Sequence, residues 1–263
     1  MGFASGRAEA ADLRDCRALV TGSSRGIGRA VALALAQAGA AVVLHGRAAS
    51  AQLDESQRAI GALTGDSATT TVLGDLRSAD VAREIVGKAV AALGGLNLLV
   101  NNAGVVAPVT SLDLDETTWD HILAVNLRGP FFAAQAAAQH MRANGGGRIV
   151  NMSSAAAEAA IDRYLAYGIA KAGLNAMTRY LAAEWATDDI TVNAVAPAFI
   201  RTEMAYEVFS KLPDLYEDQL RRVPRGRMGE PAEVAGAVVF LAGQAADFIT
   251  GEIIHVDGGY LIQ

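Results

Sequence analysis

The stretch Thr21-Gly22-Ser23-Ser24-Arg25-Gly26-Ile27-Gly28 decides the fold because of what flanks it. Residues 18–21 form a β-branched run that predicts a buried strand, and 27–38 have apolar residues at helical spacing. Between such elements, the first glycine permits a tight turn, the second lets backbone approach a pyrophosphate, and the third lets helix and strand pack closely. The helix start offers N–H groups to phosphates. The residues expected to bind a dinucleotide here are Gly22, Ser24, Arg25, Gly26, Ile27 and Gly28.

The rest of the chain repeats the alternation of strand and helix. Further strands are expected at 41–44, 69–73, 96–100, 148–152, 191–196 and 253–256, and helices at 50–64, 79–93, 116–124, 126–142, 164–186 and 231–242. Strict alternation predicts an α/β fold, in which a doubly wound parallel sheet of seven strands carries helices on both faces. We expect a flexible tail at 1–13, a single domain at 14–263, and an irregular substrate lid at about 197–230.

Composition excludes several classes of protein. With 52% hydrophobic and 19% charged residues among 263, the chain is neither disordered nor a coiled coil. A net charge of −6 argues against a nucleic-acid partner, which needs clustered Lys and Arg. The sequence contains neither a signal peptide nor an apolar run of the roughly 20 residues that span a membrane. The single cysteine, Cys16, excludes an internal disulfide and favours the cytoplasm.

Two more motifs accompany the glycine-rich turn. Asn101-Asn102-Ala103-Gly104 follows the strand expected at 96–100, and Tyr167-x-x-x-Lys171 lies on the helix expected at 164–186. Together, over residues 16–260, the three motifs resemble the classical branch of the short-chain dehydrogenase/reductase family. The resemblance implies a Rossmann-like domain, a nicotinamide cofactor held in part by Asn102, Ala103 and Gly104, and hydride transfer to or from a carbonyl or alcohol carbon.

Tyr167 and Lys171 are the first candidates for catalysis. Four residues apart on a helix, they share one face. The ordinary tyrosine pKa is about 10, and a neighbouring ammonium group is expected to lower it, which would make the pair a general acid/base. The resemblance implies that Lys171 also holds the cofactor ribose. Tyr164 is not a candidate, because Gly168 stands where a lysine would be needed.

Two further catalytic positions rest on the resemblance. Ser154, at the end of the strand 148–152, could donate a hydrogen bond to the substrate oxygen. Ser153 competes for this role, and the family's usual spacing to Tyr167 favours Ser154. Asn126 matches the fourth catalytic position of the family, where it would hold a water that links Lys171 to solvent.

The end of the second strand suggests the cofactor. NAD enzymes of this type carry a carboxylate there for the ribose 2′-OH, but this sequence has Gly46 followed by Arg47. Arg47 and Arg25 could bind a 2′-phosphate, so NADP(H) is expected rather than NAD(H). The resemblance adds further cofactor contacts, at Asp75, Leu76, Pro197, Ile200 and Thr202. The family's usual Pro-Gly is here Pro197-Ala198.

Other reactive side chains are expected to be structural. The four histidines, His45, His121, His140 and His255, have no metal-ligand spacing, so they are interpreted as surface or structural and no metal is expected. Cys16 has no visible base.

The substrate is expected to be a carbonyl compound or secondary alcohol, with an apolar wall from the lid, at Met204, Tyr206, Val208 and Phe209. We favour a small free ketone, a sugar-derived substrate or a polyol. A 3-oxoacyl-acyl-carrier-protein reductase is the alternative, and it is disfavoured because Thr187-Asp188-Asp189 stands where such enzymes often carry arginine. A nucleotide-binding regulator without turnover, or a purely structural subunit, would be alternatives of another class.

The predicted assembly is a homotetramer with D₂ symmetry. The helices expected at 126–142 and 164–186 carry small residues on more than one face, and the C-terminal stretch 253–262 is apolar to its end. A helix with several apolar faces needs a partner besides the sheet, and two different two-fold interfaces generate a tetramer.

Overall fold

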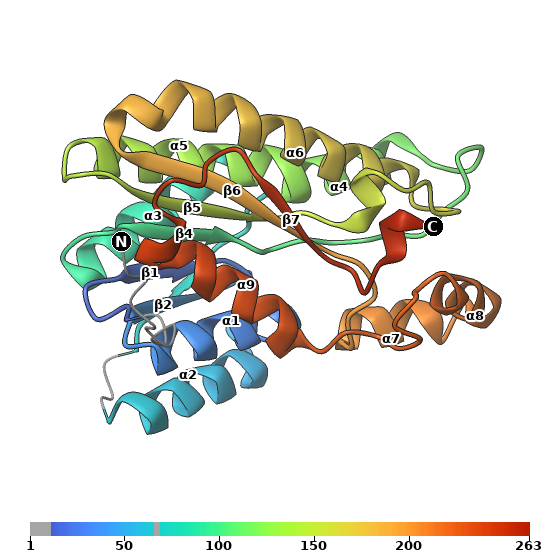
Figure 1. The fold of residues 1–263 in the computed structure, drawn as a ribbon, viewed down its shortest axis with the longest axis horizontal. Helices are drawn as coiled ribbons and strands as arrows, with labels where there is room; N and C mark the ends of the chain where they lie inside the picture. Colours follow the sequence, from blue (N-terminus) through green and yellow to red (C-terminus); the bar gives the residue numbers. More distant parts are fainter. Residues whose placement is uncertain (1–11, 66–68) are drawn as a thin grey trace, which may run out of the picture.

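The computed structural model describes residues 12–65 and 69–263, so the expected tail lies almost entirely outside the described residues. Seven parallel strands form one sheet in the order β3-β2-β1-β4-β5-β6-β7, which confirms the predicted doubly wound sheet (Figure 1). The chain changes direction across the sheet between β1 and β4. The strands are β1 Arg17–Val20, β2 Ala41–Gly46, β3 Thr71–Leu73, β4 Leu98–Asn101, β5 Gly147–Met152, β6 Ile190–Pro197 and β7 Ile253–Val256.

Helices cover both faces of the sheet. They are α1 Gly26–Gln37, α2 Ala51–Thr64, α3 Ala79–Leu93, α4 Glu116–Leu123, α5 Gly129–Arg142, α6 Leu165–Trp185, α7 Glu203–Phe209, α8 Pro213–Arg221 and α9 Pro231–Ala242. Leu19 of β1 packs into the core formed with α3, α5 and α6, whereas Val20 packs into the core formed with α1 and α9. Successive side chains thus enter opposite cores, which explains why the strands are apolar without alternation.

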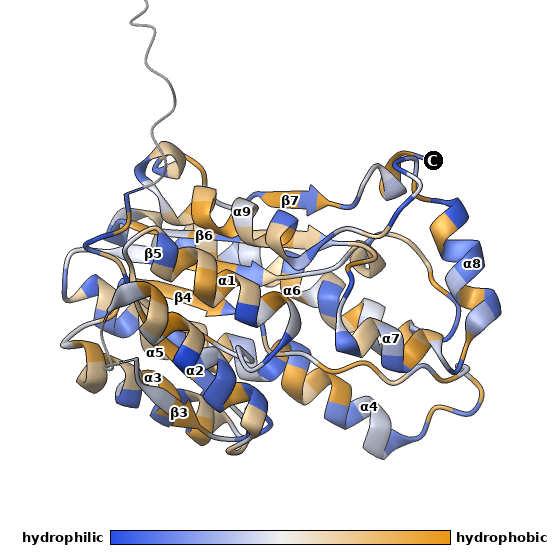
Figure 2. Ribbon diagram, turned by 90° about the horizontal axis from the view of Figure 1, so that it is seen from below, coloured by the Kyte–Doolittle hydropathy of each residue, from blue (hydrophilic) through white to orange (hydrophobic). Residues whose placement is uncertain are grey.

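Local sequence signals determine where α2 and α3 begin and end. Ser50 and Ser78 cap α2 and α3, because their hydroxyls accept hydrogen bonds from the N–H groups of Leu53 (3.2 Å) and Val81 (3.4 Å). Both helices end at a glycine with a left-handed backbone conformation. Figure 2 shows hydrophilic residues on α2 and α8, at the outside of the molecule, and hydrophobic residues along β4.

Two expectations about secondary structure were wrong in detail. The helices expected at 116–124 and 126–142 are one continuous rod, because a π-helical turn at Ala124–Arg128 joins α4 to α5. The region 197–230 is not irregular, since it contains α7 and α8. These helices have 7 and 9 residues, too few for apolar periodicity to stand out. Their starts do carry ordinary signals, the Thr202 cap and Pro213 in the first turn.

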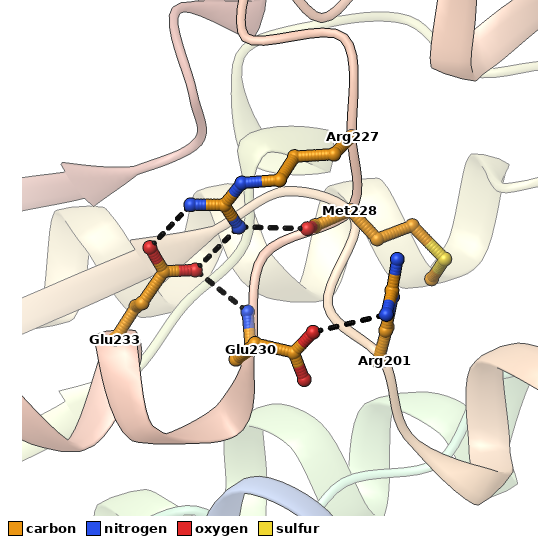
Figure 3. A network of polar contacts seen from close by, with 5 residues as sticks. All are labelled: Arg201, Arg227, Met228, Glu230 and Glu233. Atoms are coloured by element: carbon orange, nitrogen blue, oxygen red, sulfur yellow. Dashed lines mark hydrogen bonds and ion pairs between the residues drawn. The ribbon is translucent and has the colours of Figure 1, made fainter.

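A charged network fixes the base of the segment 203–226, hereafter the lid segment (Figure 3). Arg227 donates to both carboxylate oxygens of Glu233, at 2.8 and 2.7 Å, and this contact lowers the pKa of Glu233 to about 2. Glu233 also accepts a hydrogen bond from the Glu230 N–H at 2.8 Å. The Glu230 carboxylate lies 3.2 Å from Arg201, which precedes α7. These contacts therefore join Arg201, which lies just before the lid segment, to the residues that follow it.

The surface of α6 carries an apolar row that the sheet does not cover. Leu165, Ile169 and Tyr180 are exposed there, as are the small residues Ala172 and Ala176 between them. On α5, by contrast, the small residues Ala133, Ala134, Ala137 and Ala138 are buried within this chain and form the face that packs on the sheet. Phe248, near the start of the last strand, is a fully exposed apolar side chain outside this row.

Candidate active site

A cleft of about 660 Å³ opens at the carboxyl ends of the strands, the usual place for ligands in open α/β sheets. One end is lined by the glycine-rich turn and the ends of β2 and β3. The other end is lined by residues that follow β4, β5 and β6 and by α7. Almost every residue predicted to bind cofactor or to act in catalysis lines this one cleft; Asn126, which lies behind Gly104, is the exception.

The glycine-rich turn is shaped by backbone that side chains would obstruct. Gly22 and Gly26 have positive φ angles of 64° and 55°. A Cβ added to Gly28 would lie 2.3 Å from both Asn102 Nδ2 and the Gly22 carbonyl oxygen. Asn102 Nδ2 donates to the carbonyl oxygens of Thr21 (2.9 Å) and Gly22 (3.0 Å), which fixes the turn against the end of β4. The Arg25 side chain does not cap α1, so the first N–H groups of α1 remain for an anion. This cradle fits a dinucleotide pyrophosphate.

His45 supports the turn from the end of β2. Its side chain is buried, and Nδ1 accepts the hydrogen bond of the Gly22 N–H at 3.1 Å. That bond leaves the proton on Nε2, which lies 3.0 Å from the Gly74 carbonyl oxygen. Burial lowers the pKa of His45, so the ring is neutral. The described residues contain no group of side chains that could hold a metal ion.

Tyr167 and Lys171 lie together on α6, as their spacing predicted, but their protonation differs from the expectation. Lys171 Nζ lies 5.6 Å from the Tyr167 ring centroid and donates to the Met152 carbonyl oxygen at 2.7 Å. Burial lowers the pKa of Lys171 to about 8. Burial also raises the pKa of Tyr167, and a hydrogen bond with Ser154 opposes this effect in part. Burial therefore shifts the Tyr167 pKa in the direction opposite to the lowering expected from Lys171.

The two candidate serines are distinguished by their partners. Ser153 is buried, and its hydroxyl donates to Asn175 Oδ1 at 2.5 Å. Ser154 interacts with Tyr167 and accepts a hydrogen bond from the Ala156 N–H at 3.1 Å. Ser154 is thus the serine whose hydroxyl meets the tyrosine.

Asn126 lies in the π-helical turn, which gives its side chain partners that a regular helix would not. Its Nδ2 donates to the carbonyl oxygens of Ile122 and Val105, both at 2.9 Å. Its Oδ1 accepts a hydrogen bond from the Val105 N–H at 3.3 Å. A Cβ on Gly104 would lie 2.8 Å from Asn126 Oδ1 and 3.7 Å from Lys171 Nζ, so these three residues adjoin. Such π-turns are frequent at functional sites.

The end of the cleft expected to bind adenosine contains charged side chains with partners that the sequence did not predict. Arg47 lines the cleft beside Asp75, and Asp75 itself pairs with Arg77 at 2.7 Å, which lowers the pKa of Asp75. Arg25 is bound by Glu207 of α7 at 2.8 Å. The two arginines expected at a 2′-phosphate therefore differ, since Arg25 already has an anionic partner on the lid segment.

The residues expected beside the nicotinamide connect β6 to α7. Pro197 ends β6, Ile200 is buried, and Thr202 caps α7 by accepting a hydrogen bond from the Ala205 N–H at 3.2 Å. A Cβ on Gly26 would lie 3.3 Å from the Thr202 methyl group. The start of α7 thus packs directly over the glycine-rich turn. Leu76, by contrast, is buried beside the other end of the cleft.

The substrate end of the cleft includes residues that sequence analysis missed or misjudged. His121 was interpreted as surface or structural, but it lines the cleft. Tyr164 also lines it, with its ring edge-on to Tyr167 at 5.9 Å, and burial raises the Tyr164 pKa to about 12. Tyr206, expected in the apolar wall, is exposed and does not line the cleft, whereas Met204, Val208 and Phe209 do. Helix phase is the signal that could have separated Tyr206 from the others.

The comparisons with known proteins agree with this geometry. A family model described as Enoyl-(Acyl carrier protein) reductase matches residues 22–261. An NAD-dependent glycerol dehydrogenase of Listeria innocua is 36% identical over 252 residues, with 96% of each chain covered. A solved structure assigned as a short-chain alcohol dehydrogenase of Sinorhizobium meliloti superposes with a TM-score of 0.91 at 42% identity, covering 96% of this chain and 98% of the other.

The chain belongs to the short-chain dehydrogenase/reductase family. It is an oxidoreductase that acts on a carbonyl or alcohol substrate and binds NAD(P). An Agrobacterium tumefaciens structure assigned as a 2-deoxy-D-gluconate 3-dehydrogenase contains bound NADP, and it matches at 36% identity and a TM-score of 0.86 over 97% of this chain and 100% of the other. Among the described helices of this short-chain dehydrogenase/reductase, none combines the length and apolarity needed to cross a membrane.

The acidic pair Asp188-Asp189 of this family member lies away from the cleft. Both residues precede Ile190, the first residue of β6, whereas the cleft follows the last residue of that strand. Asp188 lies 3.8 Å from Arg142 at the end of α5. Their charge therefore does not face the cleft of the same chain, and it would not repel an acyl carrier protein that docks at the cleft.

Proposed function

We propose that the chain transfers hydride between NADP(H) and a ketone or secondary alcohol, with Ser154, Tyr167, Lys171 and Asn126 as its catalytic group. The observation that carries the proposal is the contact of Ser154 with Tyr167, beside buried Lys171, in the cleft that the glycine-rich turn lines. A bound nicotinamide supplies or accepts the hydride. Side chains of this protein orient the substrate oxygen and transfer its proton.

Tyr167 acts as the acid in the direction of reduction. Its raised pKa keeps the phenol protonated at neutral pH. Ser154 stabilises, by a hydrogen bond, the substrate oxygen that receives the proton. Lys171 donates to the Met152 carbonyl oxygen beside the Tyr167 ring, and it would also hold the cofactor ribose. Asn126, bonded to Val105 and adjoining Lys171, positions that amine for proton exchange.

The test is Tyr167→Phe, which removes the transferable proton and little volume. We expect turnover to fall by about 10²–10⁴-fold, while NADPH binding, followed by its fluorescence, stays within about twofold. Lys171→Ala should weaken both turnover and cofactor binding. If Tyr167→Phe keeps more than about a tenth of the wild-type rate, Tyr167 is not the acid.

We propose NADP(H) as the preferred cofactor. Arg47 borders the cleft where a NAD enzyme would present a carboxylate, and Gly46 leaves that position without one. NADP is bound in the related Agrobacterium structure, whereas the Listeria relative is NAD-dependent by name. Arg47→Asp should reverse the preference. Equal affinity of the wild-type protein for NADPH and NADH would contradict it.

A second candidate function is reduction of a 3-oxoacyl group on acyl carrier protein. It is favoured by a 3-oxoacyl-acyl-carrier-protein reductase of Aquifex aeolicus that is 38% identical over 244 residues, covering 92% of this chain. The competing proposal, supported by the galactitol 2-dehydrogenase of Cereibacter sphaeroides at 37% identity over 93% of this chain, is a small free ketone, a sugar-derived substrate or a polyol. Parallel assays with acetoacetyl-acyl carrier protein and with free ketones distinguish them. A regulator without turnover would bind NADPH and reduce neither.

The assembly that we propose is a D₂ homotetramer in the cytoplasm, with 203–226 as a mobile lid. Support for two interfaces comes from the exposed row Leu165, Ile169 and Tyr180 on α6 and from exposed Phe248 near β7. Tyr180→Glu should separate one pair of subunits and leave a dimer. Light scattering measures the mass, and a monomeric wild-type protein at micromolar concentration would refute the assembly.

A further inference from the structure

The substrate end of the cleft differs in chemistry from the cofactor end. Apolar side chains approach it from the chain segments after β4 and β6, at Val106 and Phe199, and from the lid segment, at Val208 and Phe209. These residues belong to one packed cluster, in which the Phe199 and Phe209 rings lie 5.7 Å apart. Tyr164 joins the same cluster from the start of α6. The wall is therefore apolar on the fixed side and on the lid side.

Polar groups at this end are few. Apart from Ser154 and Tyr167, the described lining residues offer the His121 ring and the Tyr164 hydroxyl. Burial raises the Tyr164 pKa to about 12, so that hydroxyl stays neutral. Among the described residues that line the cleft from 105–106, 121, 155–164, 198–199 and 203–209, the only charged one is Glu203, whose carboxylate oxygen lies 3.7 Å from the position of a Cβ on Gly26, at the glycine-rich turn. The nearby ion pair of Asp162 and Arg163 does not line the cleft.

An anionic substrate would lose water here, and the described lining residues beyond Tyr167 would offer it only the His121 ring and the Tyr164 hydroxyl as donors. A carboxylate moved into such surroundings needs a cation or several hydrogen-bond donors, and Lys171 is buried against Met152 on the cofactor side of Tyr167. A polyol would leave several hydroxyls facing Val106, Phe199 and Phe209. An alkyl or aryl group would instead bury apolar surface on both walls.

We infer that the substrate is an uncharged ketone, or its secondary alcohol, that carries an alkyl or aryl group against this apolar wall. The inference rests on the proposed function and narrows it. It separates this chain from relatives whose names specify sugar acids, such as the gluconate 5-dehydrogenase of Gluconobacter oxydans, 36% identical over 95% of this chain.

The test compares three methyl ketones with one ketone that carries hydroxyl groups on both sides of the carbonyl. We would measure kcat/KM with saturating NADPH for benzylacetone, methyl levulinate, levulinate and dihydroxyacetone. We expect kcat/KM for methyl levulinate to exceed that for levulinate by at least about tenfold, because the ester removes the charge and keeps the shape of the ketone. We also expect kcat/KM for benzylacetone to exceed that for dihydroxyacetone by at least about tenfold. Equal or higher kcat/KM values for levulinate or dihydroxyacetone would overturn the inference.

A variant with a matched control tests the wall itself. Met204 lines the cleft and is partly exposed, so the fold should tolerate Met204→Lys. The new positive charge should raise the ratio of kcat/KM for levulinate to kcat/KM for methyl levulinate severalfold. Tyr206→Lys adds the same charge to the same helix outside the cleft and should leave that ratio unchanged. Equal shifts of this kcat/KM ratio in both variants would show that the apolar wall does not determine the preference for uncharged substrates. If no carbonyl compound is reduced although NADPH binds, the proposed function fails instead.

Discussion

The two ends of the cleft are held by different kinds of structure. At the cofactor end the close packing of the backbone requires a residue without a side chain, since a Cβ on Gly28 would stand 2.3 Å from Asn102 and Gly22. At the substrate end the fit depends on side chains of the lid segment, which meets the rest of the chain at a tied base and through an apolar cluster. Side chains such as Val208 can change size or polarity without moving the sheet, whereas any side chain at Gly28 would collide with Asn102 and with the Gly22 backbone. This difference explains how relatives at 36–38% identity can share one fold and differ in the substrate that they are named for.

The largest expected effect comes from filling the cofactor end. Gly28→Ala should lower NADPH affinity by more than tenfold and the free energy of unfolding by about 1–3 kcal/mol, because the new methyl group displaces the Asn102 side chain. Calorimetric titration and thermal unfolding would measure both.

Gly87→Ala is the control for that substitution. Gly87 lies exposed within α3, and a Cβ there meets nothing within 4 Å. It should raise stability by about 0.5–1 kcal/mol and leave NADPH binding unchanged. If both alanine variants behave alike, close packing at Gly28 is not what the turn requires.

The sequence predicted the sheet and the adjacency of Tyr167 and Lys171 for a physical reason. The alternation of strands and helices, the glycine-rich turn and the spacing of Tyr167 and Lys171 depend on local periodicity and on residue types that few conformations tolerate. The misses lie where distant segments meet. The Arg25–Glu207 pair joins residues 182 positions apart, and the raised pKa of Tyr167 results from burial that only the folded chain produces. His121 was misjudged for the same reason, since nothing near it in sequence marks the cleft.

A second effect should appear at His45, which holds the glycine-rich turn from behind. Its folded pKa lies below the ordinary 6.5, so the unfolded chain binds a proton more readily than the folded one. Stability is therefore full above pH 6.5 and should fall as the pH decreases through the lowered folded value. Chemical unfolding at a series of pH values measures this.

His45→Gln removes the titrating ring. It should cost about 1–3 kcal/mol at neutral pH, because Gly22 N–H or Gly74 C=O loses a buried partner, and it should flatten the decline in stability below pH 6.5. A decline as steep as that of the wild type would assign the acid sensitivity to other groups.

A smaller effect is expected from loosening the base of the lid segment. Glu233→Gln weakens the contacts to Arg227 and to the Glu230 N–H (Figure 3), so the wall should close less often over the substrate. We expect KM for the ketone to rise severalfold while the NADPH dissociation constant stays constant. Glu84→Gln, which breaks the ion pair with Lys88 on α3, is the control and should alter neither. A rise in the NADPH dissociation constant alone would indicate that the network serves the cofactor end.

The smallest effect concerns the contact that joins the two ends, the Arg25–Glu207 ion pair at 2.8 Å. Arg25 stands in the glycine-rich turn, so a 2′-phosphate and the Glu207 carboxylate compete for one guanidinium group. Glu207→Gln should free Arg25 and tighten NADPH binding by about two- to fivefold, the range that an exposed ion pair of up to about 1 kcal/mol allows. NADH, which lacks the phosphate, should bind as before. Glu217→Gln removes the same charge from α8, where Glu217 has no partner among the described residues, and should leave both affinities unchanged. Parallel fluorescence titrations decide the matter: equal gains for NADPH and NADH would mean that Glu207 repels the pyrophosphate in general, and no gain would mean that Arg25 does not reach the 2′-phosphate.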